Sequence, residues 1–172
     1  MKLPIRVLLT AVIASATLVA CTGSKTKPSE PNGPGPSGPS NPGGSEHGRY
    51  TVESLDTDSC LRQRVVYFDF DQSTIRPEFQ AAVACHAEYL KQFRGARVTL
   101  EGNADERGTR EYNTALGERR GNAVQSALGA AGASSSQLNV VSYGEERPVC
   151  KEHGEGCWQK NRRVEIVYTA KQ

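Results

Sequence analysis

The stretch from residue 22 to about residue 48 limits most strongly what this chain can fold into. It consists mainly of Pro, Gly, Ser and Asn and has almost no large apolar side chain. It cannot bury enough apolar surface to offset the entropy lost on folding, so we expect a disordered linker with a reach of roughly 30 Å as a coil and roughly 85 Å as a polyproline helix. A fold is therefore expected only in residues 49–172, enough for one domain with a modest core.

Residues 1–20 have the pattern of a secretory signal peptide. Basic Lys2 and Arg6 come first, and the apolar run from Val7 to Ala20 is too short for a convincing membrane-spanning helix. The run ends in Leu-Val-Ala before Cys21, which resembles the lipobox of bacterial lipoproteins. This resemblance implies export, cleavage before Cys21 and lipid on that cysteine. A plain signal peptide followed by an incidental cysteine is the alternative.

Lipid on Cys21 would tie the chain to a membrane. Each buried CH₂ contributes about 0.8 kcal/mol, so three acyl chains, the number that the lipobox implies, hold far more firmly than one myristoyl group. Thr22 follows the cysteine, at the position where an Asp would signal retention in the inner membrane of enteric-type bacteria. We therefore expect the chain at the outer membrane, anchored on the periplasmic face.

The charge balance of the mature chain is close to neutral. The whole sequence has 21 basic and 19 acidic residues, and loss of Lys2 and Arg6 with the signal peptide lowers the basic number to 19. Proteins that bind nucleic acid need a basic surface to neutralise phosphates. Nothing in this composition indicates a nucleic-acid partner.

Four cysteines remain once Cys21 is assigned to lipid, and an exported chain can oxidise them. Three pairings are possible in principle. Cys150 and Cys157 flank a short polar loop that contains Gly, while Cys85 points away from the apolar stripe of its predicted helix. We therefore expect the disulfides Cys150 with Cys157 and Cys60 with Cys85.

A zinc site is the alternative use of these cysteines. Structural zinc sites combine Cys and His at short paired spacings. The three histidines lack such spacing: His47, His86 and His153. We expect no metal and no cofactor.

Strand and helix patterns alternate along residues 64–168. Two segments have helical periodicity: one begins at Pro77 and stops before Gly95, and one begins at Arg110, capped by Thr109, and ends near residues 129–132. Alternation of this kind predicts a mixed sheet with the helices on one face. Four segments have the composition of strands: Arg64–Phe70, Arg97–Gly102, Asn139–Tyr143 and Arg162–Tyr168.

The second predicted helix carries a charged side chain where an apolar one is expected. Arg120 lies near the middle of its apolar face, and Arg119 lies toward the edge. A buried guanidinium needs a partner, because an unpaired buried charge is costly. An internal salt bridge, or a side chain that reaches solvent past small alanines, is the alternative to a ligand. The apolar face itself consists of Leu116, Ala123, Val124, Ala127 and Ala131.

Several motifs together resemble one family. They are the loop Gly102–Gly108 after a strand, the helix Tyr112–Val124, and the stretches Val66–Asp71, Val141–Pro148 and Lys160–Arg163. This set resembles the OmpA-like peptidoglycan-binding domain family, and most closely its peptidoglycan-associated lipoprotein (Pal) members. Any one of the motifs alone would be weak.

The resemblance implies a βαβαββ domain of the α+β class, with a mixed four-stranded sheet and helices packed on one face. It also implies a ligand, the free end of meso-diaminopimelate in peptidoglycan, which bears one ammonium and one carboxylate. By motif position Asp105 takes the ammonium and Arg120 the carboxylate, through the paired hydrogen bonds of a guanidinium. The resemblance adds Asp71 as a further acid, Phe70 as a wall, and Asn161 with Arg162 as the rim.

Two positions depart from the family pattern. Asn103 stands where many members have His, and Arg110 stands where Pro often opens the helix. Neither change removes the charged pair. The change at position 103 affects a hydrogen bond beside the expected pocket.

The resemblance implies a protein that is not an enzyme and that holds the outer membrane to peptidoglycan, together with the Tol system and TolB in particular. An OmpA-like structural protein of another envelope machine would share the same pocket. A cell-wall hydrolase is the third possibility, with Asp69, Asp71, Asp105 and Glu106 as candidate acids and bases. No nucleophile elbow, HExxH motif or Cys-His arrangement supports hydrolysis.

Overall fold

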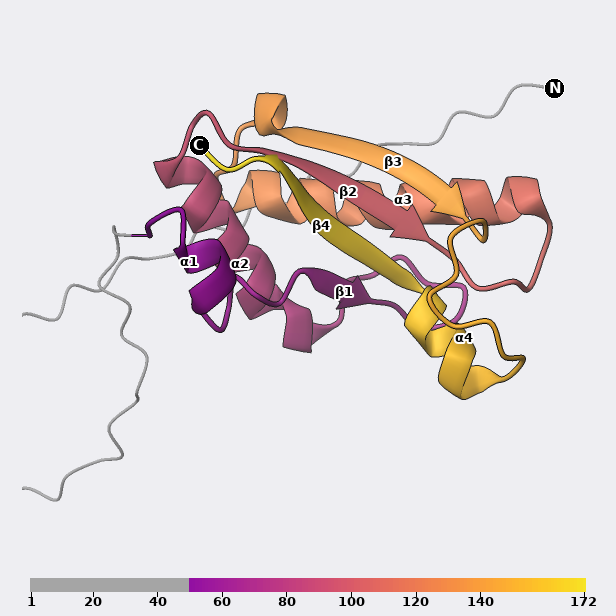
Figure 1. Ribbon diagram of the computed structural model, residues 1–172. Coiled ribbons are helices and arrows are strands. Elements are labelled where there is room, and N and C mark those ends of the chain that lie inside the picture. The colour runs from indigo at the N-terminus through magenta and orange to yellow at the C-terminus, as the bar shows by residue number, and fades with distance from the viewer. Residues whose placement is uncertain (1–49) are drawn as a thin grey trace, which may run out of the picture. The chain divides into compact units, whose positions relative to one another are not determined.

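The computed structural model describes residues 50–172, so the expected signal peptide, lipid-bearing Cys21 and linker lie outside the described residues. The described chain forms a mixed four-stranded sheet (Figure 1). Its order is β1-β4-β2-β3, with β2 and β3 parallel and both other pairs antiparallel. The strands are β1 (Val65–Tyr67), β2 (Arg97–Asn103), β3 (Leu138–Gly144) and β4 (Arg163–Ala170).

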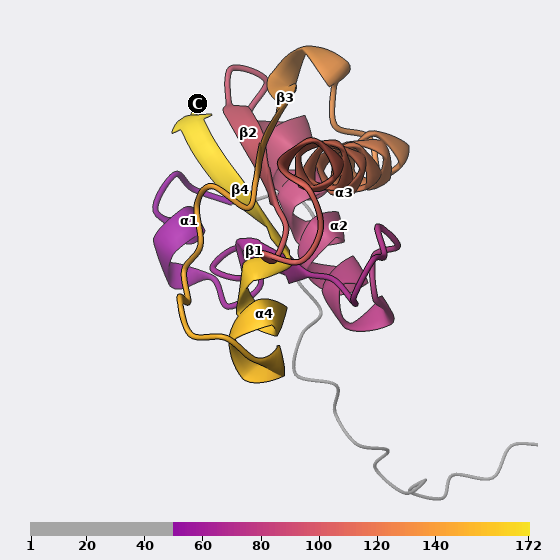
Figure 2. The same ribbon diagram turned by 90° about the vertical axis from the view of Figure 1, so that its right-hand side faces the viewer.

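The two long helices, α2 (Pro77–Gln92) and α3 (Arg110–Ala130), cover one face of the sheet (Figure 2). Thr109 caps α3, because its hydroxyl accepts a hydrogen bond from the Tyr112 amide. The core between helices and sheet is apolar and includes Phe68, Leu100, Leu128 and Ile166. Burial of these apolar side chains stabilises the packing of the helices on the sheet. The predicted α+β fold class is confirmed.

Three short helices were not predicted. They are α1 (Ser54–Thr57), the 3₁₀ turn η1 (Ser135–Gln137) and α4 (Glu155–Asn161). The helix α4 contains a glycine, follows another at its N-cap and buries only Cys157 and Asn161, so its sequence carries no helical periodicity. No helix in the described part of the chain is long and apolar enough to cross a membrane.

The first strand is shorter than predicted. The expected segment Arg64–Phe70 forms a strand only over Val65–Tyr67, and one further hydrogen bond joins the Phe68 amide to the Arg162 carbonyl oxygen. The chain then turns away, with Asp71 in the left-handed region at a φ of 56°. Phe70 has a high strand propensity, but the strand cannot continue to it because the backbone turns at this point.

Two glycines let α3 lie directly on β2. A Cβ atom on Gly102 would lie 2.0 Å from the Gly117 carbonyl oxygen, and one on Gly117 would lie 2.9 Å from the Gly102 carbonyl oxygen. No other residue fits between the two backbones at this separation. The contact sets the distance from the helix to the strand end, and with it the depth of Arg120 one turn further along α3.

Both expected disulfides are present. Cys60 and Cys85 join with Cα atoms 6.2 Å apart, and Cys150 and Cys157 join with Cα atoms 5.2 Å apart. The first ties the segment before β1 to α2. The second closes a loop between β3 and β4.

Gly117→Ala should lower the free energy of unfolding by about 2–4 kcal/mol, because the added methyl group forces helix and strand apart. Gly129→Ala in the same helix is the matched control, since a Cβ there meets nothing within 4 Å. This change should stabilise the domain by up to about 1 kcal/mol, the usual cost of Gly inside a helix. Urea titration of both variants measures the difference. Equal effects in the two variants would contradict the close contact.

His86 is a buried titratable group on the face of α2 that packs on the sheet. Its Nε2 lies 3.3 Å from the Gln63 carbonyl oxygen and its Nδ1 lies 2.9 Å from the Tyr168 hydroxyl. A carbonyl can only accept, so the neutral ring donates from Nε2 and accepts at Nδ1. Burial lowers the pKa of His86 to about 4. The folded protein therefore holds this imidazole neutral.

The free energy of unfolding should fall as the pH is lowered from about 6.5 toward 4, because the unfolded chain binds a proton that folded His86 does not. Each pH unit costs about 1.4 kcal/mol, so the loss reaches about 3 kcal/mol at the lower end. Above pH 6.5 the ring is neutral in both states and the term vanishes. The free energy of unfolding, measured by urea titration at several pH values in this range, should depend more steeply on pH in the unmodified chain than in His86→Gln. Identical slopes would show that His86 does not titrate as argued.

Candidate ligand-binding cleft

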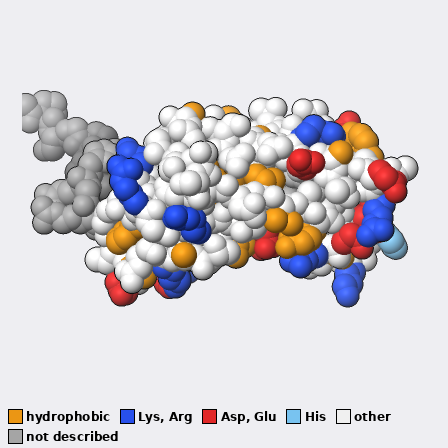
Figure 3. All heavy atoms as spheres, turned by 90° about the horizontal axis from the view of Figure 1, so that it is seen from above, with side chains coloured by type: hydrophobic (Ala, Val, Ile, Leu, Met, Phe, Trp, Pro, Cys, Tyr) orange, Lys and Arg blue, Asp and Glu red, His pale blue; other side chains and the backbone are white. Residues whose placement is uncertain are grey.

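A cleft of about 210 Å³ lies where β1 and β2 end and α3 begins. At this end of the domain, on the right in Figure 3, acidic, basic and histidine side chains lie next to one another. The cleft is lined by Phe70 and Asp71 after β1, by Asp105, Arg107 and Gly108 after β2, and by Tyr112, Asn113, Leu116 and Arg120 of α3.

Arg120 is completely buried and bonded to backbone. Its Nε donates to the Gln72 carbonyl oxygen at 2.8 Å, Nη1 to that of Asn103 at 2.8 Å, and Nη2 to that of Asp69 at 3.1 Å. Its neighbour Arg119 is exposed, as the helical wheel predicted. The salt bridge considered as an alternative is absent, since no carboxylate of residues 50–172 forms an ion pair with Arg120. Its charge is instead stabilised by these carbonyl dipoles and by the Phe68 ring, whose centre lies 5.3 Å from Arg120 Cζ.

The electrostatics of Arg120 favour an anion. Burial, together with the nearby charge of Arg162, lowers the pKa of Arg120 to about 10, so it remains protonated near neutral pH. A guanidinium has five N–H groups, and the three bonds to carbonyls leave one on each terminal nitrogen. A carboxylate that binds a guanidinium through two parallel hydrogen bonds needs two such N–H groups.

Asp105 lies in the loop after β2 and is only 4% exposed. Its Oδ1 accepts from the Arg107 amide at 3.1 Å and from Arg107 Nε at 3.0 Å, while Oδ2 accepts from Arg107 Nη2 at 2.7 Å and Arg162 Nη1 at 3.2 Å. Burial raises the pKa of Asp105, but the hydrogen bonds from Arg107 and Arg162 outweigh it, and the net shift is downward. The carboxyl group is therefore ionised.

Arg107 forms the outer wall of the cleft and is held by more than Asp105. Its Cζ atom lies 3.9 Å from the centre of the Phe70 ring and 4.2 Å from that of Trp158, distances typical of cation–π contacts. Phe70 is 55% exposed, which is unusual for a large apolar side chain. The aromatic wall expected at Phe70 therefore lies beside the cleft, with a cation stacked on it.

Asp71, the residue after Phe70, also lines the cleft. Its left-handed backbone conformation costs energy for a residue with a Cβ atom, although Asp tolerates it better than most. Its Oδ1 accepts a hydrogen bond from the hydroxyl of Tyr112, which is itself 43% exposed. Backbone strain of this kind is concentrated at functional sites. Both acids expected from the sequence thus face the same cleft as Arg120.

The two residues expected at the rim, Arg162 and Asn161, lie in different places from each other. Arg162 is 4% exposed and joins the Phe68 carbonyl oxygen, Asp105 and Glu155, so it lies behind Asp105. Asn161 does not line the cleft. Its amide bonds the backbone of residues 149 and 150, and it lines a separate hollow of about 400 Å³ beside Glu106.

Sequence reasoning missed five residues that line the cleft. Arg107 and Gly108 lie two and three positions after Asp105, inside the loop motif, and proximity in that motif is a signal that could have found them. Asn113 and Leu116 lie seven and four positions before Arg120, on the same side of α3. Tyr112 is the first residue of the helix motif Tyr112–Val124, and this position is the signal that could have found it. Among residues 50–172, no group of three or more His, Cys, Asp and Glu side chains could hold a metal ion.

The comparisons with known proteins agree on one family. The OmpA family profile matches residues 67–162. The chain therefore belongs to the OmpA family. Within it, the relative named peptidoglycan-associated lipoprotein from Pseudomonas aeruginosa is 46% identical over 155 residues, 90% of this chain and 91% of that protein. The protein of the same name from Pseudomonas putida is 54% identical over 114 residues, 66% of this chain and 68% of its own length.

Solved structures agree with this assignment. The peptidoglycan-associated lipoprotein from Burkholderia pseudomallei aligns with a TM-score of 0.66 at 44% identity, over 67% of this chain and 98% of that one. The C-terminal domain of MotB from Helicobacter pylori aligns with a TM-score of 0.56 at 20% identity, over 61% of this chain and 82% of that one, which shows a shared fold. The resemblance to Pal inferred from motifs is thus confirmed.

Proposed function

We propose that this protein binds peptidoglycan without covalent chemistry, by taking the free end of a meso-diaminopimelate residue into the cleft. The observation that carries the proposal is the fully buried Arg120, a cation without an ion-pair partner among residues 50–172, beside two acids in one cleft. A ligand that bears one carboxylate and one ammonium complements this arrangement. The relatives' name, peptidoglycan-associated lipoprotein, supports peptidoglycan as the polymer that is bound.

In this proposal the ligand carboxylate binds the two remaining N–H groups of Arg120. The ammonium binds Asp105, with Asp71 as a second acid at the opening, and Phe70 forms the wall. Arg162 and Asn161 act from behind, because Arg162 holds Asp105 and Asn161 holds the backbone of the neighbouring loop. Since Arg120 is 0% exposed and Asp105 is 4% exposed, side chains around the cleft must shift to admit the ligand.

The charge state of the cleft suits binding better than hydrolysis. A general acid in glycoside hydrolysis needs a carboxyl group with a raised pKa. The pKa of Asp105 is lowered, so this group is a fixed anion rather than a proton donor near neutral pH. We therefore propose a non-enzymatic tether between the outer membrane and the wall. The partnership with TolB and the Tol system, and a role in cell division, rest on the family resemblance.

Asp105→Asn and Arg120→Lys should each reduce binding of the whole chain, kept in detergent, to purified peptidoglycan sacculi by at least about tenfold, since the first removes the anion and the second removes the paired hydrogen bonds. Lysine keeps the charge of Arg120 but cannot make paired bonds. Arg119→Lys is the matched control and should bind as the unmodified chain does. Cosedimentation with sacculi measures all three variants.

Three outcomes of that experiment are informative. Retained binding by both cleft variants, with native circular dichroism, would exclude the cleft as the site. Loss of binding in Arg119→Lys would point to an unspecific effect of the helix surface. Release of soluble muropeptides from the sacculi by the unmodified chain would favour the hydrolase alternative.

We also propose that lipid on Cys21 anchors the protein in the outer membrane. Cys21→Ser should move the chain from the membrane fraction to the soluble periplasmic fraction, because about three acyl chains are lost at once. Density-gradient separation of inner and outer membranes, with immunodetection of the chain, measures the effect. The variant Cys60→Ser with Cys85→Ser is the control and should remain with the membrane. A membrane location unchanged in Cys21→Ser would exclude the lipid anchor.

A further inference from the structure

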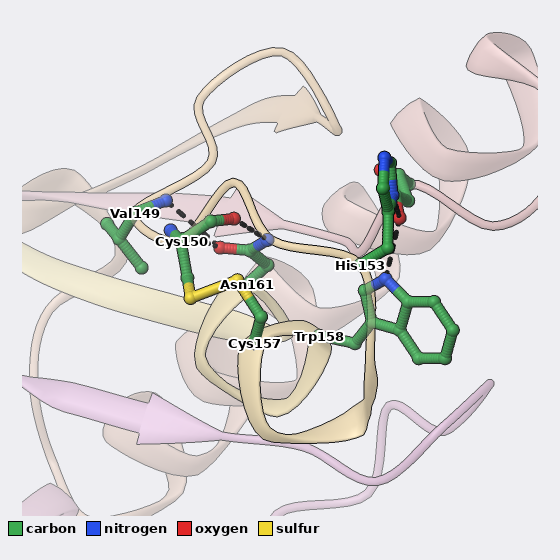
Figure 4. The surroundings of a disulfide bond; sticks show 7 residues. Val149, Cys150, His153, Cys157, Trp158 and Asn161 are labelled. Atoms are coloured by element: carbon green, nitrogen blue, oxygen red, sulfur yellow. Dashed lines mark hydrogen bonds and ion pairs between the residues drawn. A yellow bond between two sulfur atoms is a disulfide. The ribbon is translucent and has the colours of Figure 1, made fainter.

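The segment between β3 and β4 forms a closed loop beside the cleft, which we call the disulfide loop (residues 150–157). The Cys150–Cys157 bond joins its ends, and the side-chain amide of Asn161 holds the first of them (Figure 4). Asn161 Oδ1 accepts from the amides of Val149 at 3.0 Å and Cys150 at 3.1 Å, and its Nδ2 donates to the Cys150 carbonyl oxygen at 2.8 Å.

Apart from this closure, the disulfide loop is held by contacts of exposed side chains: His153 Nδ1 lies 2.6 Å from Glu106 Oε1, and Glu155 pairs with Arg162. Only Cys157 is buried among residues 150–157, and Lys151, Glu152 and His153 are exposed. The helix α4 that follows has seven residues, and isolated helices of that length are not stable in water. Its N-cap, Gly154, makes no side-chain cap. The disulfide therefore adds a covalent constraint on the position of α4 to the contacts of its side chains.

Two side chains of α4 reach the residues around Asp105. Glu155 pairs with Arg162 and lies 3.6 Å from Arg107 Nη2. Trp158 donates from Nε1 to Glu106 Oε1 at 2.7 Å, and its ring centre lies 4.2 Å from Arg107 Cζ. In Figure 4 the indole of Trp158 and the ring of His153 lie on the same side of the loop. The helix thus contacts the cleft wall through Arg107.

We infer that the Cys150–Cys157 disulfide is a positioning element of the proposed ligand site. It holds α4 so that Glu155 and Trp158 fix Arg107, and Arg107 in turn fixes the carboxylate of Asp105. Neither cysteine lines the cleft that contains Asp105 and Arg120. The inference rests on the proposed function, because it concerns how that site is kept ready for its ligand.

Preorganisation of this kind changes affinity without a change of contacts. When a wall residue is already ordered, binding does not have to order it. Without the disulfide, Arg107 and the loop carrying Asp105 would sample more conformations in the free protein. The affinity for the ligand should then fall by about three- to tenfold, the effect of ordering one or two long side chains on binding.

Paired cysteine variants of the whole chain in detergent test the inference. The probe is a soluble muropeptide whose stem ends in meso-diaminopimelate, and isothermal titration calorimetry measures its dissociation constant. Cys150→Ser with Cys157→Ser should weaken binding by about three- to tenfold. Cys60→Ser with Cys85→Ser is the matched control and should bind within about twofold of the unmodified chain, since neither residue lines the cleft. Unchanged affinity in the first pair would overturn the inference.

A second measurement separates positioning from general stability. If the disulfide acts through Arg107, its removal should have no further effect on affinity in an Arg107→Ala background, whereas independent effects would multiply. Multiplied losses would overturn the inference. Trp158 is the single Trp of the chain, so its emission should also shift to longer wavelength when the disulfide is removed. A failure of the proposed function is distinct, because the unmodified chain would then not bind the muropeptide at all.

A third variant covers the case in which the Ser pair does not fold. Trp158→Ala leaves the disulfide in place and removes both the ring from Arg107 and the bond to Glu106. It should weaken binding as the Ser pair does. Trp158→Phe restores a ring over Arg107 and should recover part of the affinity. Full affinity in Trp158→Ala would overturn the link between α4 and the cleft.

Discussion

A single buried guanidinium joins three parts of the domain that are far apart in the sequence. Arg120 comes from α3, and it bonds carbonyl oxygens in the turn after β1 and at the end of β2. A lysine could not reach three such acceptors from one position, because its donors diverge from one atom. The turn that carries Asp71 and the strand end that leads to Asp105 are both held against the same side chain. The geometry of the cleft therefore depends on this one residue.

The backbone contact between α3 and β2 makes that arrangement possible. Gly102 and Gly117 bring the helix so close to the strand that the Arg120 guanidinium lies among strand-end carbonyls instead of solvent. The cost of burying the charge is offset by carbonyl dipoles, which leaves hydrogen-bonding capacity without a neutralising carboxylate. The proposed zwitterion site needs a cation that no carboxylate of the protein pairs with. Packing and the proposed recognition thus depend on the same two glycines.

Periodicity and charge predicted the parts of this structure that depend on local sequence. The helical wheel distinguished Arg120 from Arg119. The polar loop between Cys150 and Cys157, together with the outward position of Cys85 on its helix, predicted both disulfides. The early end of β1 was not predictable, because it depends on a left-handed turn at Asp71 that Arg120 stabilises from another element. The role of Trp158 was also not predictable. Its helix has no periodic pattern, and its neighbours in space, Arg107 and Glu106, are some 50 positions away.

The described chain starts at the opposite end of the domain from the cleft. Tyr50 lies against Gln92 at the end of α2, to which its amide donates at 2.9 Å, whereas the cleft lies where β2 finishes (Figure 1). The length of β2, at about 3.3 Å per residue, puts these two ends roughly 20 Å apart. A pull between an anchored N-terminus and a wall fragment held in the cleft would then run lengthwise along the strands. Hydrogen bonds between neighbouring strands would share that load in parallel, so the sheet would resist tension by shear instead of opening bond by bond.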